Sequence, residues 1–198
     1  MKKAFIFAWL LLLFTGVIAL FWYNEWRYSL PTPVPQNYRS ISFGQHISPD
    51  SKLTFKNNKP LFLHFFNPDC PCSRFNITHF KELVRQYGNS VNFAVVLMTD
   101  KYYSAEEVKT KFDLTVPVVV DSDIAIKCGV YSTPQAAIIN TDSKLYYRGN
   151  YNQSRYCTNE KSEYAKMALN GLLQHNQHLV FNQLALKAYG CTLPKCNL

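Results

Sequence analysis

The strongest constraint on the fold of this chain is the stretch from Leu61 to Phe80, where a short apolar run leads into two closely spaced cysteines and then into a helical pattern. Residues 61–66 are apolar at every position but one, as in a strand buried on both faces, and such strands are usually central and parallel. After the cysteines, apolar residues recur at helical spacing until Gly88. The sequence therefore predicts a central strand joined to a helix by a tight turn that carries Cys70 and Cys72.

The position of these two cysteines favours thiol chemistry. The free N–H groups and the dipole at a helix N-terminus stabilise an anion, and the thiolate is the reactive form of cysteine. The Cα atoms of two cysteines one residue apart lie near the upper end of the roughly 4.4–6.8 Å that disulfides accept, so the pair can be bridged, and a strained bridge is easily reduced. We therefore expect a Cys70–Cys72 disulfide that acts as a redox couple.

These residues resemble the thioredoxin-like superfamily. Its members place a nucleophilic cysteine about five residues after a strand phenylalanine, within a C-x-x-C motif, and the interval from Phe65 to Cys70 is the same. The chain departs from the motif, because Ser73 stands where the family has its second cysteine and the second thiol lies at Cys72. The resemblance implies that Cys70 is the nucleophile. Cys72 is the first-choice resolving thiol, while a more distant cysteine or monothiol chemistry at Cys70 remain open.

A second motif supports the resemblance. Gly129-Val130 is followed by Thr133-Pro134 at the start of an apolar run, and thioredoxin-like proteins have a cis-proline loop in this context. That loop faces the nucleophile and presents its backbone to the substrate, so the resemblance implies substrate binding by Thr133 and Pro134. The residues expected to tune the thiol of Cys70 are its neighbours Asp69, Pro71, Ser73 and Arg74.

The remaining pattern predicts an α/β domain of the thioredoxin-like fold, with a central mixed β-sheet flanked by helices, over residues 39–176. Further strands are expected at 91–98 and 116–120. The strand that follows Pro134 and a strand at 145–149 are expected to form an antiparallel hairpin through a turn at 141–144. Pro117 marks the strand at 116–120 as an edge strand or an extended connection. Helices are expected at 104–112, which Ser104 and Glu107 open as a capping box, and at 123–127 and 162–174. The C-terminal extension, residues 177–198, resembles nothing that we can name.

The N-terminal segment predicts a membrane anchor over residues 1–23. Ala4 to Tyr23 carries no charge and is long enough to cross a bilayer as a helix. Lys2 and Lys3 favour a cytoplasmic N-terminus. The competing interpretation is a cleaved signal peptide, since residues 17–19 weakly resemble a cleavage site. A proline-rich spacer, residues 24–38, follows. We expect a single-pass protein of the bacterial inner (cytoplasmic) membrane, with its domain on the periplasmic, extracytoplasmic side.

Six cysteines in an oxidising compartment favour disulfides, although spacing does not assign their connectivity. Cys191 and Cys196 most simply close a small loop in the tail. Cys128 and Cys157 then pair with each other or act as resolving thiols, and Cys128 is the better placed because it lies six residues before Pro134.

Charge and composition exclude some function classes. The net charge is +8, or +6 without the two N-terminal lysines, and it is spread along the chain without the Lys/Arg runs that bind nucleic acid. We expect no nucleic-acid partner, no cofactor and no resident metal. The partners expected are protein thiols or disulfides, an unidentified redox protein, and the membrane through the N-terminal helix.

The predicted function is thiol-disulfide exchange, and three alternatives stay open. Residues 66–71 also resemble the peroxidatic loop of peroxiredoxins, although Asn67 stands where those enzymes usually have Thr or Ser. A Cys-x-Cys pair also suits Cu(I), with His64 or His79 completing a copper-delivery site. The third alternative is a thioredoxin fold that serves only as a binding module.

Overall fold

The computed structural model describes residues 2–48, 53, 55, 57–153, 157, 160–176 and 179–192. The chain divides into two units, Met1–Pro31 and Thr32–Leu198.

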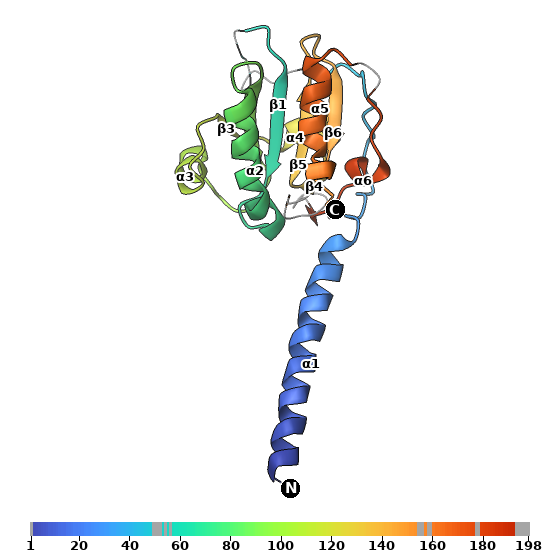
Figure 1. Ribbon diagram of the computed structural model, residues 1–198. Helices are drawn as coiled ribbons and strands as arrows, with labels where there is room; N and C mark the ends of the chain where they lie inside the picture. The colour runs from blue at the N-terminus through green and yellow to red at the C-terminus, as the bar shows by residue number, and fades with distance from the viewer. Residues whose placement is uncertain are drawn as a thin grey trace. The chain divides into compact units, whose positions relative to one another are not determined.

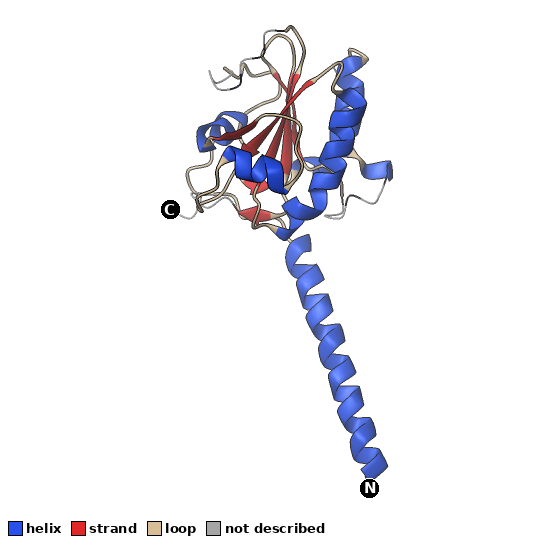
Figure 2. Ribbon diagram, turned by 90° about the vertical axis from the view of Figure 1, so that its left-hand side faces the viewer, coloured by secondary structure: helices blue, strands red, loops and turns tan. Residues whose placement is uncertain are grey.

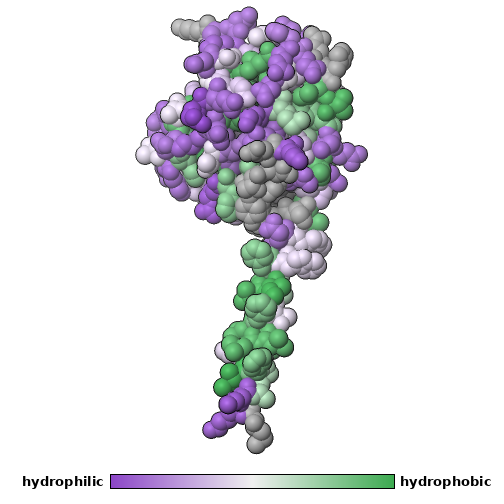
Figure 3. Space-filling view, in the orientation of Figure 1, coloured by the Kyte–Doolittle hydropathy of each residue, from purple (hydrophilic) through white to green (hydrophobic). Residues whose placement is uncertain are grey.

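The first unit is the helix α1, Lys2–Ser29. Its segment Lys2–Trp26 is long and apolar enough to span a membrane, a criterion that a signal sequence near the N-terminus also meets. Apolar side chains cover the surface of α1, with lysines only at its start (Figure 3). The helix extends beyond the predicted anchor, residues 1–23, and an exposed apolar surface of this size is characteristic of a segment that contacts a membrane or another protein.

The second unit is built on a five-stranded mixed sheet (Figure 1). In the order β3-β2-β1-β5-β6, its strands are Val118–Val120, Asn92–Leu97, Leu61–Phe66, Gln135–Ile139 and Leu145–Gly149. β1 pairs parallel with β2, which pairs parallel with β3, whereas β5 is antiparallel to both β1 and β6. The prediction of a buried, central β1 is confirmed, because all six of its residues are buried. β3 lies at the sheet edge, as Pro117 indicated.

Helices lie on both faces of this sheet (Figure 2). Along the chain they are α2 Pro71–Tyr87, α3 Ala105–Lys111, α4 Ser122–Cys128, α5 Tyr164–Leu173 and α6 Gln183–Leu186, with a 3-10 turn at Glu160–Ser162. The predicted N-cap of α3 is confirmed, since the Ser104 hydroxyl accepts a hydrogen bond from the Glu107 amide at 3.1 Å. The structure bears out the fold class: a thioredoxin-like α/β domain.

The alternating side chains of β1 divide the core in two. Phe62 and Phe66 pack with residues of α2 and α5, while Leu63 and Phe65 pack with residues of α4. Both clusters are buried, so β1 is held from both faces and its C-terminal end is fixed. The turn that carries the cysteines starts from this end.

The C-terminal extension adds a strand that the sequence did not predict. β7, Cys191–Thr192, pairs antiparallel with β4, Ser132–Thr133, as a separate two-stranded sheet. Thr133 lies opposite Cys191, and Ser132 opposite Thr192. The tail therefore returns to the loop that precedes Pro134.

Candidate active site

Cys70 is the N-cap residue of α2, and the turn before it is organised by Asn67. The Asn67 carbonyl accepts a hydrogen bond from the Cys70 amide at 3.1 Å, and its side-chain oxygen accepts one from the Asp69 amide at 2.9 Å. Pro71 then opens the helix, a position that proline favours because it needs no hydrogen-bond donor there. The predicted junction of strand and helix is confirmed, with Cys70 at the positive end of a 17-residue helix.

The structure contains a disulfide between Cys70 and Cys191, which are 121 residues apart in the sequence and have Cα atoms separated by 6.1 Å. The expected Cys70–Cys72 bridge is therefore wrong, and so is the Cys191–Cys196 loop. Cys72 lies one residue inside α2 and is 2% exposed, whereas β7 brings Cys191 to the cap residue. Cys196 lies outside the described residues. The only signal for Cys191 in the sequence was an even cysteine count, which leaves connectivity open.

The loop at Thr133-Pro134 faces Cys70. The bond between these two residues is cis, and the Thr133 carbonyl oxygen lies 3.6 Å from the sulfur of Cys70. Figure 1 shows β4 and the first turn of α2 at the same end of the sheet. The structure thus brings together the cysteine and the loop that the sequence predicted, and it adds Cys191 as a third component.

The residues expected to tune Cys70 have distinct surroundings. Asp69 is held by the loop after β2, because its Oδ1 atom accepts a hydrogen bond from the Tyr103 hydroxyl at 3.0 Å and lies 3.2 Å from Lys101 Nζ. The hydrogen bond to Asp69 raises the pKa of both Lys101 and Tyr103. Ser73 is buried and accepts a hydrogen bond from the Asn67 amide, while Arg74 is exposed. No pattern in the sequence indicated that Lys101 and Tyr103 would contact the turn that carries Cys70.

Cys128 is a buried thiol and Cys157 a half-buried one. Burial raises the pKa of Cys128 to about 12. Burial also raises the pKa of Cys157 to about 11, even though Asn76 donates a hydrogen bond to its sulfur at 3.0 Å. These two cysteines do not pair with each other, which was one of the two roles that the sequence left open for them, and their raised pKa values disfavour a thiolate at either sulfur.

His64 and His79 belong to the buried cluster between β1 and α2. His64 is fully buried, its ring stacks on Phe80 at 4.4 Å, and its Nδ1 atom shares a 2.7 Å hydrogen bond with the Tyr151 hydroxyl. Burial lowers the pKa of His64 to about 3, so the ring is neutral. Among the described residues, no three His, Cys, Asp or Glu side chains lie close enough to hold a metal ion. The copper alternative gains no ligand set from this part of the chain.

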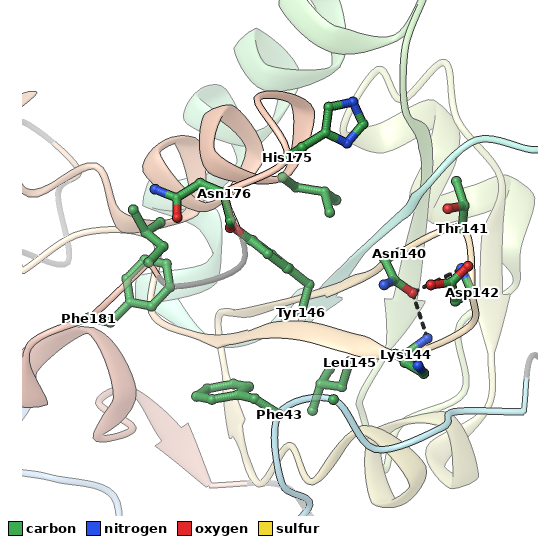
Figure 4. Close-up of a pocket in the computed structure, with 13 residues that line it drawn as sticks. Phe43, Asn140, Thr141, Asp142, Lys144, Leu145, Tyr146, His175, Asn176 and Phe181 are labelled. Atoms are coloured by element: carbon green, nitrogen blue, oxygen red, sulfur yellow. Dashed lines mark hydrogen bonds between the residues drawn. The ribbon is translucent and has the colours of Figure 1, made fainter.

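A pocket of about 510 Å³ lies elsewhere, at the turn between β5 and β6 (Figure 4). It is lined by polar residues of that turn, such as Asn140 and Lys144, and by apolar residues such as Phe181. Tyr146 closes one side by donating a hydrogen bond to the Asn176 carbonyl at 2.6 Å. No cysteine lines this pocket, and β5 runs from Pro134 toward it, so it belongs to the other end of the strand from Cys70.

Solved structures share this architecture. A hypothetical protein from Sinorhizobium meliloti 1021 is 18% identical, covering 79% of this chain and 96% of its own, with a TM-score of 0.63. An uncharacterized conserved protein from Geobacillus kaustophilus is 20% identical, covering 83% and 97%, with a TM-score of 0.63. A thioredoxin-like protein in its oxidized form is 14% identical, covering 73% and 97%, with a TM-score of 0.50. A search of curated proteins finds no match.

The chain has the thioredoxin-like fold, with a cysteine at the start of α2. More specifically, residues 41–195 match the family described as a domain of unknown function, DUF6436, and the chain belongs to that family. The match includes Cys70, Pro134 and Cys191, so all three components of the candidate site lie within the family's domain.

Proposed function

We propose that this protein is a membrane-anchored, extracytoplasmic thiol-disulfide oxidoreductase that acts on protein thiols and disulfides through Cys70. The observation that carries the proposal is the Cys70–Cys191 disulfide, which joins the first turn of a long helix to a strand lying against the Thr133-Pro134 loop. This bridge includes the sulfur of Cys70, which lies at the N-terminus of α2. The helix N-terminus stabilises the thiolate that forms when the bridge opens.

Cys191 is the resolving thiol in this proposal. In the reducing direction, the Cys70 thiolate attacks one sulfur of a substrate disulfide, the substrate S–S bond breaks, and the second substrate sulfur leaves as a thiolate. The Cys191 thiolate then attacks Cys70, releases the first substrate sulfur and re-forms Cys70–Cys191. The substrate gains two electrons and the protein loses two. Cys72 was the first-choice resolver from sequence, and the experiment below tests both assignments.

The reverse reaction begins at Cys191. Cys70 is 2% exposed, while Cys191 is partly exposed, so an incoming thiolate from a dithiol protein reaches the sulfur of Cys191 first. Attack there breaks the S–S bond and releases Cys70 as the thiolate. A leaving thiol of low pKa departs faster, and the helix N-terminus lowers the pKa of the sulfur that leaves.

The location follows from the N-terminal segment and the redox chemistry together. The apolar α1 suits a single-pass anchor, and the two lysines before it favour a cytoplasmic N-terminus. The domain then lies on the extracytoplasmic side, where disulfides persist.

The test is a redox titration of the detergent-solubilised full chain across a glutathione series, with alkylated peptides identified by mass spectrometry. We expect Cys70 and Cys191 to change state together, at a potential typical of exchange catalysts. Cys191→Ser would then trap Cys70 in mixed disulfides, while Cys72→Ser would leave the couple intact. A Cys70–Cys191 bridge that no dithiol opens would make it a structural link and would refute the proposal.

A further inference from the structure

The segment around Cys191 is held from two sides. On one side it pairs with β4, and on the other the amide of Thr32 donates a hydrogen bond to the Ala188 carbonyl at 2.9 Å. The two sides are linked, because the hydroxyls of Thr32 and Ser132 lie 2.9 Å apart and the Ser132 hydroxyl donates to the Cys191 carbonyl at 3.2 Å. Thr32 and Ser132 are both buried. The tail therefore lies in a slot with polar walls that contact its backbone.

The slot has no room for a side chain at the residue that precedes Cys191 in the sequence. Gly190 has φ +140°, a conformation that L residues rarely adopt. A Cβ atom on Gly190 would overlap the carbonyl oxygen of Thr133 and would lie 3.2 Å from the Ser132 hydroxyl. Thr133 is fully buried, so this wall of the slot is backbone that cannot move aside as a flexible side chain would.

We propose that Thr32, Ser132 and Thr133 form a slot that is specific for a glycine-cysteine pair. The chain's own Gly190-Cys191 then competes for this slot with an extended Gly-Cys segment of a partner polypeptide. The proposal rests on the proposed function, since it names the class of substrate that Cys70 accepts. A partner segment that replaces β7 as an antiparallel strand would place its cysteine opposite Thr133. Cys191 occupies this position in the structure and is bonded there to Cys70.

Competition follows from burial. Cys70 is 2% exposed when the tail is in place, so a partner's cysteine reaches it only after the tail leaves. A dithiol protein reduces Cys70–Cys191 and is itself oxidised to a disulfide, which leaves only the noncovalent contacts of the slot. The tail then exchanges with the partner segment, whose cysteine is held in a disulfide. Cys70 attacks that cysteine, the other sulfur of the substrate disulfide leaves as a thiolate, and Cys191 then returns and displaces the partner cysteine from the mixed disulfide.

The experiment uses the reduced full-length chain in detergent and two peptides that differ at one position. Both copy the tail sequence around its cysteine, one with Gly and one with Ala before the cysteine, and each carries a chromogenic thiol in a mixed disulfide. Attack by Cys70 forms a protein–peptide disulfide and releases the chromophore. We expect the Gly peptide to react about tenfold faster than the Ala peptide, because the added methyl overpacks the slot. Cystamine, which has no backbone to bind, measures the intrinsic reactivity of Cys70.

Two variants separate the slot from the chemistry. Gly190→Ala expels the tail, so we expect slower closure of Cys70–Cys191 together with faster capture of the Gly peptide. Gly16→Ala, in α1 with no atom within 4 Å of the added Cβ, is the matched control. Thr32→Val removes the hydroxyl partner of Ser132 and should reduce the preference for the Gly peptide.

The outcomes are distinguishable. Equal rates for the two peptides, or unchanged peptide capture in Gly190→Ala, would overturn the Gly-Cys slot while leaving Cys70 reactive. Failure of cystamine and both peptides to react with the reduced protein would instead contradict the proposed function.

Discussion

The cap of α2 and the interior of the domain hold the same residue type in opposite electrostatic settings. At the cap, Cys70 lies at the positive end of a helix and is bonded to a partly exposed partner. Away from the cap, desolvation raises the pKa of the buried Cys128 to about 12 and of the half-buried Cys157 to about 11. The difference teaches that position relative to a helix terminus and to solvent selects the reactive sulfur.

The largest expected effect is in alkylation rate. Near neutral pH a thiol with a pKa of about 12 has roughly a thousandfold less thiolate than one with the ordinary value of about 8.5. In the reduced folded chain, iodoacetamide should therefore modify Cys128 at least about a thousandfold more slowly than Cys70, and Cys157 should lie between them. Time-resolved mass spectrometry of the labelled peptides measures the three rates. Comparable labelling of Cys128 and Cys70 would remove the basis of the comparison.

The next effect is on exchange activity. Cys70→Ser removes the sulfur that bonds to substrate, so we expect reduction of a model protein disulfide to fall to about a hundredth or less. Cys128→Ala is the matched interior control, and its activity should stay within about twofold of the native value because that thiol is buried and protonated. Comparable losses in the two variants would show that folding, rather than chemistry, accounts for the effect.

The sequence predicted the elements but not the way in which distant segments meet. Three local patterns predicted features that the structure contains: the apolar run at 61–66, the cap at Ser104 and the motif at Thr133-Pro134. The partner of Cys70 was not predictable, because a two-residue strand such as β7 has no periodicity to detect. Its position depends on backbone pairing with β4 and on Thr32, which lies 159 residues before Cys191 in the sequence.

A smaller effect is expected on the stability of the domain. The Cys70–Cys191 bridge closes a 121-residue separation, and disulfides typically stabilise a fold by about 2–4 kcal/mol. Urea unfolding of the domain in detergent should show this loss in Cys191→Ser, and in the native chain after reduction. The Cys157→Ser variant should retain the Cys70–Cys191 bridge and lose less stability than Cys191→Ser. Identical midpoints for the oxidised and reduced chains would show that the bridge adds no stability.

The smallest effect, when expressed per pH unit, extends the comparison to protons, because the interior also keeps His64 neutral. Its pKa is about 3 in the folded protein, lowered first by burial and then by His79, against an ordinary value of about 6.5 when unfolded. Between these two values the unfolded chain binds the extra proton, so stability is fully present above about pH 6.5 and is lost as the pH falls toward 3. One such group changes the free energy of unfolding by at most about 1.4 kcal/mol per pH unit.

A double variant isolates the contribution of His64 to this pH dependence and leaves no buried hydroxyl group without its hydrogen-bond partner. His64→Phe with Tyr151→Phe removes both ends of the 2.7 Å hydrogen bond and keeps an aromatic ring stacked on Phe80. We expect its unfolding free energy to depend less steeply on pH than that of the native chain. The remaining slope includes His79, whose pKa is also lowered by burial and partly restored by Glu163. If the double variant keeps the full slope, the acid sensitivity of the fold arises from groups other than His64.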